Sequence, residues 1–196
     1  MKTRFTVTSR RAFTLIELLV VITIISMLAS LVSTAVMKVM DNAQRVRAHA
    51  ALSDIVMAVN NYHTEYNRYP VPAADNSEEP VRLSAGNTML KILLGGNDNK
   101  MNPKGSTYLQ PPMAKNGAGG LSGSDGSQAL NDPWGGAYEV AVDANFDNRI
   151  SNPDKENEDP SISQNVPSNL VFGVIASSYG RDGKKGTKDD VVSWRQ

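Results

Sequence analysis

Three acidic residues near the carboxyl end of the chain have the chemistry that a hard cation requires. Asp182, Asp189 and Asp190 lie within the glycine-containing stretch 178–190. Calcium takes about six to eight oxygen ligands from carboxylates, carbonyls and water. Glycine lets the backbone turn tightly enough to bring such oxygens together. The stretch is therefore a candidate calcium site, and the alternative is a surface turn whose acids are simply solvated.

A second acidic stretch follows the first part of an EF-hand calcium loop. Asp143, Asn145 and Asp147 occupy alternate positions, Ile150 is an apolar eighth residue, and Asp154 falls at the twelfth position. The sixth position holds Asn where an EF-hand has Gly, and the twelfth holds Asp where it has Glu. The alternative is a loop whose Asn and Asp side chains form turns.

The chain contains no recognisable catalytic set. It has no cysteine, which excludes a thiolate metal site and a cysteine nucleophile. His49 and His63 stand apart from any metal-binding or triad motif, and we expect both to be solvated. Lys and Arg together number 20, equal to the 20 Asp and Glu, so the composition does not predict a nucleic-acid partner. We do not expect an enzyme.

The amino-terminal part of the chain differs in composition from the part that carries these acids. All 15 Gly and all 10 Pro lie after residue 69, so residues 1–69 favour one uninterrupted helix. The first twelve residues carry four basic residues and no acid, and the twenty residues 18–37 carry no charge. Twenty helical residues cover about 30 Å, the thickness of a bilayer core. The basic flank predicts a cytoplasmic amino terminus and an exported remainder.

Three simpler interpretations of this segment are a cleaved secretory signal, a buried helix of a soluble protein, and a plain signal anchor. None explains why Glu17 stands at the edge of the apolar run. A carboxylate at bilayer depth is costly unless it is paired. If the chain were cut between Ala12 and Phe13, the new α-ammonium of Phe13 would lie one helical turn from Glu17, in the same subunit or a neighbouring one.

The stretch from Arg10 to Ile22 resembles the processing signal of type IV prepilins and type II secretion pseudopilins. The resemblance implies cleavage at Ala12–Phe13 by a prepilin peptidase that also methylates the new amino terminus at Phe13. It also implies that Glu17 serves subunit assembly. The chain departs from the family pattern in one position, because Ala12 stands where Gly is usual.

The helix is expected to continue after the apolar run as an amphipathic helix. Its apolar residues recur at spacings of three and four, which marks one helix face: Leu52, Ile55, Val59, Tyr62, Tyr66 and Tyr69. Ordinary packing against a globular domain is the expected use of this face, with a coiled-coil dimer as the alternative. Tyr69-Pro70 is expected to end the helix.

The rest of the chain predicts a small sheet. A short helix is expected at 88–94, capped by Asn87 or Thr88, and residues 114–128 are Gly- and Ser-rich and expected to be mobile. Strands are expected at 138–142, 170–176 and 191–194. The predicted fold class is α+β: a long amino-terminal helix packed on an antiparallel sheet of about three strands, as in pilins. The expected segments are a leader (1–12), a membrane and filament-core helix (13–39), its amphipathic continuation (40–69), a variable loop region (70–131) and a β-sheet domain with acidic loops (132–196).

Two carboxyl-terminal motifs resemble the major pseudopilins of type II secretion systems. Asp132-Pro133-Trp134-Gly135 resembles the turn that leads into their sheet, and residues 178–194 resemble their terminal loop, which binds calcium in that family. Calcium is thus the cofactor that the resemblance implies. The implied partners are prepilin peptidase, like and related pilin subunits, and an inner-membrane assembly platform.

The resulting hypothesis is a structural subunit of a pilus-like filament in protein secretion. Its implied location is the cytoplasmic membrane, as a single-pass protein with an exported carboxyl-terminal domain, and the filament after assembly. Two alternatives remain. A type IV pilin for adhesion, motility or DNA uptake would share the amino-terminal processing motif. A membrane-anchored calcium-binding module that does not polymerise would share the membrane anchor.

Overall fold

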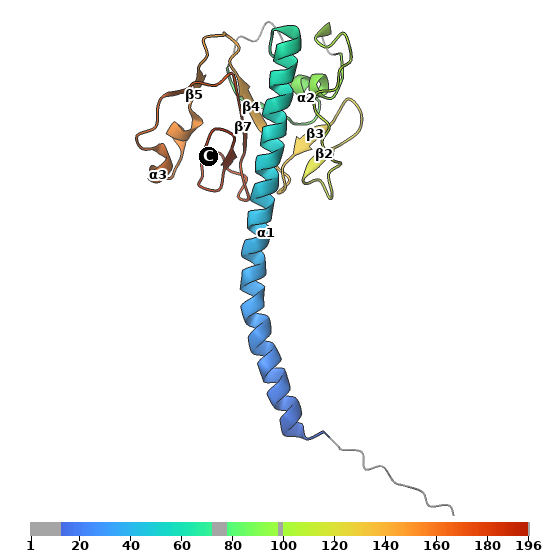
Figure 1. Ribbon diagram of the computed structural model, residues 1–196, viewed down its shortest axis with the longest axis vertical. Coiled ribbons are helices and arrows are strands. Elements are labelled where there is room, and N and C mark those ends of the chain that lie inside the picture. Colours follow the sequence, from blue (N-terminus) through green and yellow to red (C-terminus); the bar gives the residue numbers. More distant parts are fainter. Residues whose placement is uncertain (1–12, 72–77, 98–99, 196) are drawn as a thin grey trace, which may run out of the picture. The chain divides into compact units, whose positions relative to one another are not determined.

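The computed structural model describes residues 13–71, 78–97 and 100–195, with only the helical backbone described for residues 31–35. The chain divides into two compact units, Met1–Asn42 and Ala43–Gln196. The helix α1, Leu15–Tyr66, has 52 residues and belongs to both units (Figure 1). The predicted leader 1–12, with Ala12 of the predicted cleavage bond, lies outside the described residues.

The first unit consists of the apolar part of α1. Its described apolar side chains are exposed, from 83% for Leu15 to 45% for Val21. Such a surface calls for a partner or an apolar environment. Among the described residues, no helix is both long enough and apolar enough to qualify as a membrane span.

In the second unit, the carboxyl-terminal half of α1 forms one side of the hydrophobic core. Leu52, Ile55, Val59 and Tyr62 are all 0% exposed, as the spacing predicted. α1 ends at Tyr66, and Asn67 follows in the left-handed conformation with φ 51°, which is a common way to end a helix. The helix therefore ends three residues before Tyr69-Pro70, where the sequence placed its end, because Asn67 already leaves the helical conformation.

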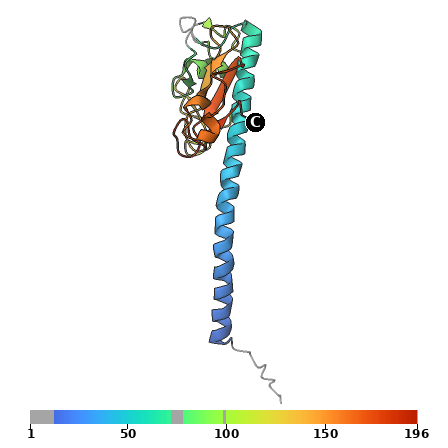
Figure 2. The ribbon, with the colours of Figure 1, turned by 90° about the vertical axis from the view of Figure 1, so that its left-hand side faces the viewer.

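The sheet that packs on α1 has four antiparallel strands in the order β1-β4-β7-β8. These strands are β1 (Val81–Arg82), β4 (Glu139–Val142), β7 (Val174–Ser178) and β8 (Val191–Val192). Figure 2 shows the sheet lying along this part of α1. Val140, Val142 and Val174 share the core with α1, whereas Ala141 and Ile175 form a second cluster with Ile150, so both sheet faces are covered.

The predicted strand 170–176 is in fact divided. Leu170 belongs to β6 (Asn169–Leu170), which pairs with β5 (Ile150–Ser151), and the main sheet resumes only at Val174. Gly173 lies at the break, where a Cβ atom would stand 2.4 Å from the Tyr69 hydroxyl. Gly173 O still accepts a hydrogen bond from Asp143 N at 3.0 Å, and the backbone at Gly173 passes directly against Tyr69.

The region 70–131 contains more regular structure than expected. Besides β1 it holds α2 (Thr88–Leu93), whose predicted cap Asn87 accepts a hydrogen bond from Leu90 N at 3.0 Å. It also holds the hairpin of β2 (Gly120–Ser122) and β3 (Ala129–Asn131), in a stretch expected to be a mobile loop. β2 is anchored because Leu121 N donates to Pro112 O at 2.8 Å and Leu121 is buried.

The remaining elements form a small lobe beside the terminal strand. They are the 3-10 helix η2 (Pro153–Glu156) and the short helix α3 (Pro160–Ser163), each with proline at its start and an Asn or Asp cap. This lobe positions the carboxyl-terminal acidic loop described below.

Candidate functional site

Glu17 forms a capping box at the start of α1. Its Oε2 atom accepts hydrogen bonds from the Thr14 backbone N at 2.9 Å and from the Thr14 hydroxyl at 2.8 Å. Glu17 N in turn lies 3.3 Å from Thr14 Oγ1. Phe13, the residue at which the mature chain is predicted to begin, is 75% exposed. The acid is therefore held at the helix start, next to the predicted new amino terminus.

The predicted calcium loop near the carboxyl end brings its three acids together. Asp189 Oδ2 accepts hydrogen bonds from Arg181 N at 2.7 Å and Asp182 N at 3.0 Å, which folds the loop around this side chain. Asp190 Oδ2 accepts from Gly186 N at 2.8 Å. Asp182, Asp189 and Asp190 are thus parts of one compact loop, but among the described residues the three acids whose carboxylate oxygens all lie within 4.8 Å of one another are Glu78, Asp143 and Asp147 and not these three.

These acids converge on the hydroxyl of Thr187, which the sequence did not single out. Thr187 Oγ1 lies 2.7 Å from Asp189 Oδ1 and 3.4 Å from both Asp182 Oδ1 and Asp190 Oδ1. The carbonyl oxygen of Lys184 is 3.3 Å from the same hydroxyl. One hydroxyl has a single proton to donate, so most of these oxygens remain available as acceptors. The arrangement is a cluster of hard oxygen donors, which fits calcium chemistry.

The electrostatics of the loop differ between its two neighbouring acids. Burial acts to raise the pKa of Asp189, but the Thr187 hydroxyl and the backbone N–H groups of Asp182 and Arg181 outweigh it, so this pKa is lowered. Burial raises the pKa of Asp190 above its usual value, with the Gly186 and Thr187 N–H groups opposing the effect. Asp189 is therefore the acid that the loop itself keeps ionised.

A buried glutamate on the sheet contacts the start and the middle of this loop. Glu139 of β4 is 7% exposed and accepts a hydrogen bond from the Tyr179 hydroxyl. Its other oxygen forms an ion pair with Lys185 Nζ at 3.1 Å. The Arg82 guanidinium lies 5.1 Å from the centre of the Tyr179 ring. The loop is thereby attached to the sheet at two points.

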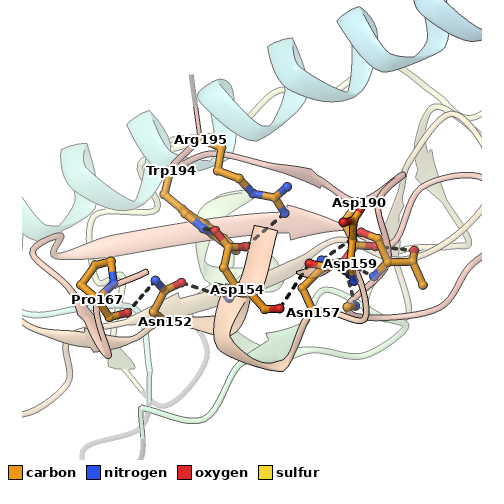
Figure 3. Close-up of polar contacts among 11 residues, drawn as sticks. Asn152, Asp154, Asn157, Asp159, Pro167, Asp190, Trp194 and Arg195 are labelled. Atoms are coloured by element: carbon orange, nitrogen blue, oxygen red, sulfur yellow. Dashed lines mark hydrogen bonds and ion pairs between the residues drawn. The ribbon is translucent and has the colours of Figure 1, made fainter. Parts of the chain in front are cut away.

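The lobe of η2 and α3 supports the loop from the other side (Figure 3). Asn157 donates from Nδ2 to the Thr187 carbonyl oxygen at 3.1 Å, and Lys188 pairs with Asp159 at 3.3 Å. Asp154, which is 5% exposed, accepts from Trp194 Nε1 at 2.9 Å and pairs with Arg195 at 3.1 Å. Asp154 therefore holds the carboxyl-terminal segment and does not complete an EF-hand loop, because η2 turns it away from the 143–148 stretch.

The second predicted calcium loop folds as a series of Asx turns. Asp143, 4% exposed, accepts from Asp147 N at 3.1 Å and from Asn148 N at 2.7 Å, and Asn145 Oδ1 accepts from Asp147 N at 2.8 Å. Asn148 adopts φ 59°, the conformation that an EF-hand assigns to glycine.

The structure adds Glu78 to this loop. One carboxylate oxygen each from Glu78, Asp143 and Asp147 lie within 4.8 Å of one another. Burial raises the pKa of Glu78, and the charges of Asp147 and Asp143 raise it further. Glu78 is far away in the sequence and belongs to no motif, so no local signal identified it.

The histidines differ in environment. His49 is exposed, as expected, but His63 is half-buried. The His63 ring stacks on Tyr69 with 4.5 Å between ring centres, so the prediction of a solvated His63 is wrong. Packing of the 143–148 loop over the end of α1 causes this burial, because Phe146 lies 5.9 Å from the same ring.

Comparison with known proteins adds two findings. The family described as the prokaryotic N-terminal methylation motif matches residues 8–33. The chain is also similar to the type II secretion system core protein G of Klebsiella michiganensis, with 24% identity over 186 residues, covering 95% of this chain and 94% of that protein. No solved structure gives a significant match.

Proposed function

Because the chain is a type IV pilin-like protein of the pseudopilin kind, we propose that it is a structural subunit of a pilus-like filament that serves type II protein secretion. One observation carries this proposal: the methylation motif at residues 8–33 coincides with the start of a single helix whose other end packs on a small sheet. The similarity to core protein G extends over nearly the whole chain and supports secretion as the filament's role.

The first step of the proposed mechanism is removal of the basic leader. Prepilin peptidase cuts the Ala12–Phe13 bond and methylates the amino group of Phe13. The exposure of Phe13 and its position just before α1 support access to this bond. Ala12 keeps the small side chain that such a cut requires next to the scissile bond.

The second step is recognition between subunits at Glu17. The capping box holds the carboxylate beside the helix start, where it can receive the amino terminus of a neighbouring subunit. An ion pair formed there offsets the cost of enclosing an acid among apolar helices. Before assembly, the subunit resides in the cytoplasmic membrane through residues 13–39 and meets the assembly platform there, with its carboxyl-terminal domain exported. The uncharged run 18–37 and its basic flank support this location.

Calcium binding by the loop 178–190 would stiffen the exported domain. Asp182, Asp189 and Asp190 supply carboxylate oxygens, and the Lys184 carbonyl and the Thr187 hydroxyl are further ligands at the same place. The donor set consists only of oxygens and includes both carboxylates and a carbonyl, which fits calcium. A second calcium site is proposed at Asp143 and Asp147, with Glu78 as the additional ligand and Asn145 supporting the turn.

The experiment that tests the filament proposal is mass spectrometry of the mature protein together with isolation of filaments from cells. A chain that begins with N-methyl-Phe13 and sediments as filaments is the expected result. An intact Met1, or a cut near Ala29, would instead point to the anchored module or a secretory signal. Loss of secretion when the gene is deleted separates a secretion subunit from a pilin for adhesion, motility or DNA uptake.

A further inference from the structure

Glu139 and Lys185 form an ion pair that the proposed calcium site does not use. Glu139 Oε1 lies 3.1 Å from Lys185 Nζ, and the two side chains are 8% and 42% exposed. An ionised carboxylate in so buried a place is costly unless it is paired. Glu139 belongs to β4, whereas Lys185 stands in the middle of the loop 178–190, between Lys184 and Gly186. The pair therefore fixes a positive charge next to the proposed calcium ligands.

Lys185 has carboxylates other than Glu139 close to it. It lines a small cavity of about 10 Å³ together with Asp190 and Asp154. The backbone next to Lys185 already touches one of these acids, because Gly186 N donates to Asp190 Oδ2 at 2.8 Å. Asp154 is occupied by its ion pair with the carboxyl-terminal segment. Asp190 is therefore the carboxylate that a released Lys185 ammonium would meet.

We propose that Glu139 is a positioning residue that keeps the Lys185 ammonium away from Asp190 and so leaves this acid available to calcium. This inference rests on the proposed calcium site in the loop 178–190. An ammonium paired with Asp190 would occupy a ligand and place a positive charge beside the cation, and both effects weaken calcium binding. The lysine side chain is long and flexible, so it can reach a second carboxylate without a change in the backbone.

The alternative is that the ion pair only fastens the loop to the sheet. Glu139 also accepts a hydrogen bond from the Tyr179 hydroxyl, and Arg82 of β1 is its cross-strand neighbour. Glu139 therefore keeps a hydrogen bond and a nearby cation when Lys185 is removed. The two explanations make opposite predictions for that removal. Loss of an anchor would weaken calcium binding, whereas loss of a sequestered positive charge would not.

Isothermal titration of the full-length protein in detergent with calcium separates these explanations. The parent protein carries Asp143→Asn, which removes the second proposed site. Glu139→Gln keeps the shape of the side chain and an acceptor for Tyr179 but loses the charge, and we expect it to bind calcium about tenfold more weakly than the parent. Lys185→Met should bind calcium as tightly as the parent. The double variant Glu139→Gln/Lys185→Met should recover the parent affinity to within about threefold.

Lys184→Met is the matched control for the loss of one positive charge, since Lys184 precedes Lys185 and is exposed. Combined with Glu139→Gln, it should restore far less of the affinity, and equal rescue by both lysines would assign the effect to net charge and overturn the inference. Unchanged binding in Glu139→Gln, weakened binding in Lys185→Met, or a double variant as weak as Glu139→Gln would also overturn it while leaving the calcium site in place. A parent protein that binds no calcium would instead defeat the proposed site itself.

Discussion

The carboxylate of Asp132 lies 2.5 Å from the hydroxyl of Ser178, 46 residues further along the chain. Its other oxygen accepts hydrogen bonds from Trp134 N and Gly136 N, both at 2.9 Å. One side chain, 1% exposed, therefore forms the turn before β4 and joins it to the end of β7. Asp132 of the Asp-Pro-Trp-Gly motif thus holds the sheet to the start of the loop 178–190.

Replacing Asp132 by Ala should destabilise the exported unit by about 2–4 kcal/mol, because two backbone N–H groups and a buried hydroxyl lose their acceptor. Chemical denaturation of the full-length protein in detergent measures this change. Asp125→Ala is the matched control, since Asp125 accepts one exposed hydrogen bond from Gln128 at 3.2 Å. The control should change stability by less than about 0.5 kcal/mol. Similar values for the two variants would show that the turn does not depend on Asp132.

Asp154→Ala should release the carboxyl-terminal segment and cost about 2 kcal/mol, since the Trp194 N–H and the Arg195 guanidinium lose their shared partner. The Arg195 side chain is 31% exposed, so solvent reduces the cost below that of a fully buried pair. Lys188→Ala removes the exposed ion pair with Asp159 and should cost less than about 1 kcal/mol. Tryptophan fluorescence during urea unfolding measures the unfolding free energy of both variants. A loss of unfolding free energy in Asp154→Ala no larger than that in Lys188→Ala would contradict the role assigned to Asp154.

Glu17→Ala should leave cleavage at Ala12–Phe13 intact but prevent filament assembly, because the neighbouring amino terminus loses its counter-charge. Mass spectrometry checks the cleavage, and sedimentation of sheared filaments checks the assembly. Thr14→Ala separates helix capping from subunit pairing, since it removes the hydroxyl contacts of the capping box and keeps the acid. Filaments should persist in Thr14→Ala. Normal assembly of Glu17→Ala would exclude the pairing.

Calcium should raise the melting temperature of the wild-type protein, and a chelator should reverse the effect. At a calcium concentration near a hundred times Kd, the stabilisation is about 2.7 kcal/mol, which corresponds to roughly 5–10 °C for a domain of this size. Asp189→Asn should abolish the larger part of the shift, and Asp143→Asn tests the second loop separately. Magnesium is the control ion, because it prefers a smaller octahedral site. A wild-type protein that shows no shift would exclude both calcium sites.

The stability of the exported unit should fall in alkaline solution through its buried tyrosines. Burial raises the pKa of Tyr138, and the nearby Asp132 charge raises it further. A tyrosine whose folded pKa exceeds its unfolded pKa contributes stability that is fully present below about pH 10 and is lost as the pH rises beyond it. Unfolding free energies measured from pH 8 to pH 11.5 should therefore decline above about pH 10. The unfolding free energy of Tyr138→Phe should decline less steeply with pH, by up to about 1.4 kcal/mol per pH unit. An unchanged slope would assign the alkaline loss of stability to other groups.

Local features of the sequence predicted a large part of this protein. The absence of Gly and Pro before residue 70 predicted an uninterrupted helix, and apolar residues at spacings of three and four predicted its buried face. The amino-terminal cap of α2 at Asn87 and the tight turns of the loop 178–190 also followed from neighbouring residues. Periodicity, capping and tight turns depend on residues only a few positions apart, so the sequence alone contains the information.

Only the tertiary structure decided which distant groups meet. It brought Glu78 to Asp143 and Asp147, and it paired Asp154 with Arg195. It added β1 to the sheet. It also divided the strand expected at 170–176, at the point where Gly173 lies against Tyr69. It also placed residues 108–113 beside the part of α1 between Gln44 and Asn61, where the two segments line a groove. These contacts depend on strand register and on how each buried surface is covered, which result from the balance of packing over the whole unit. No single segment of the chain encodes them.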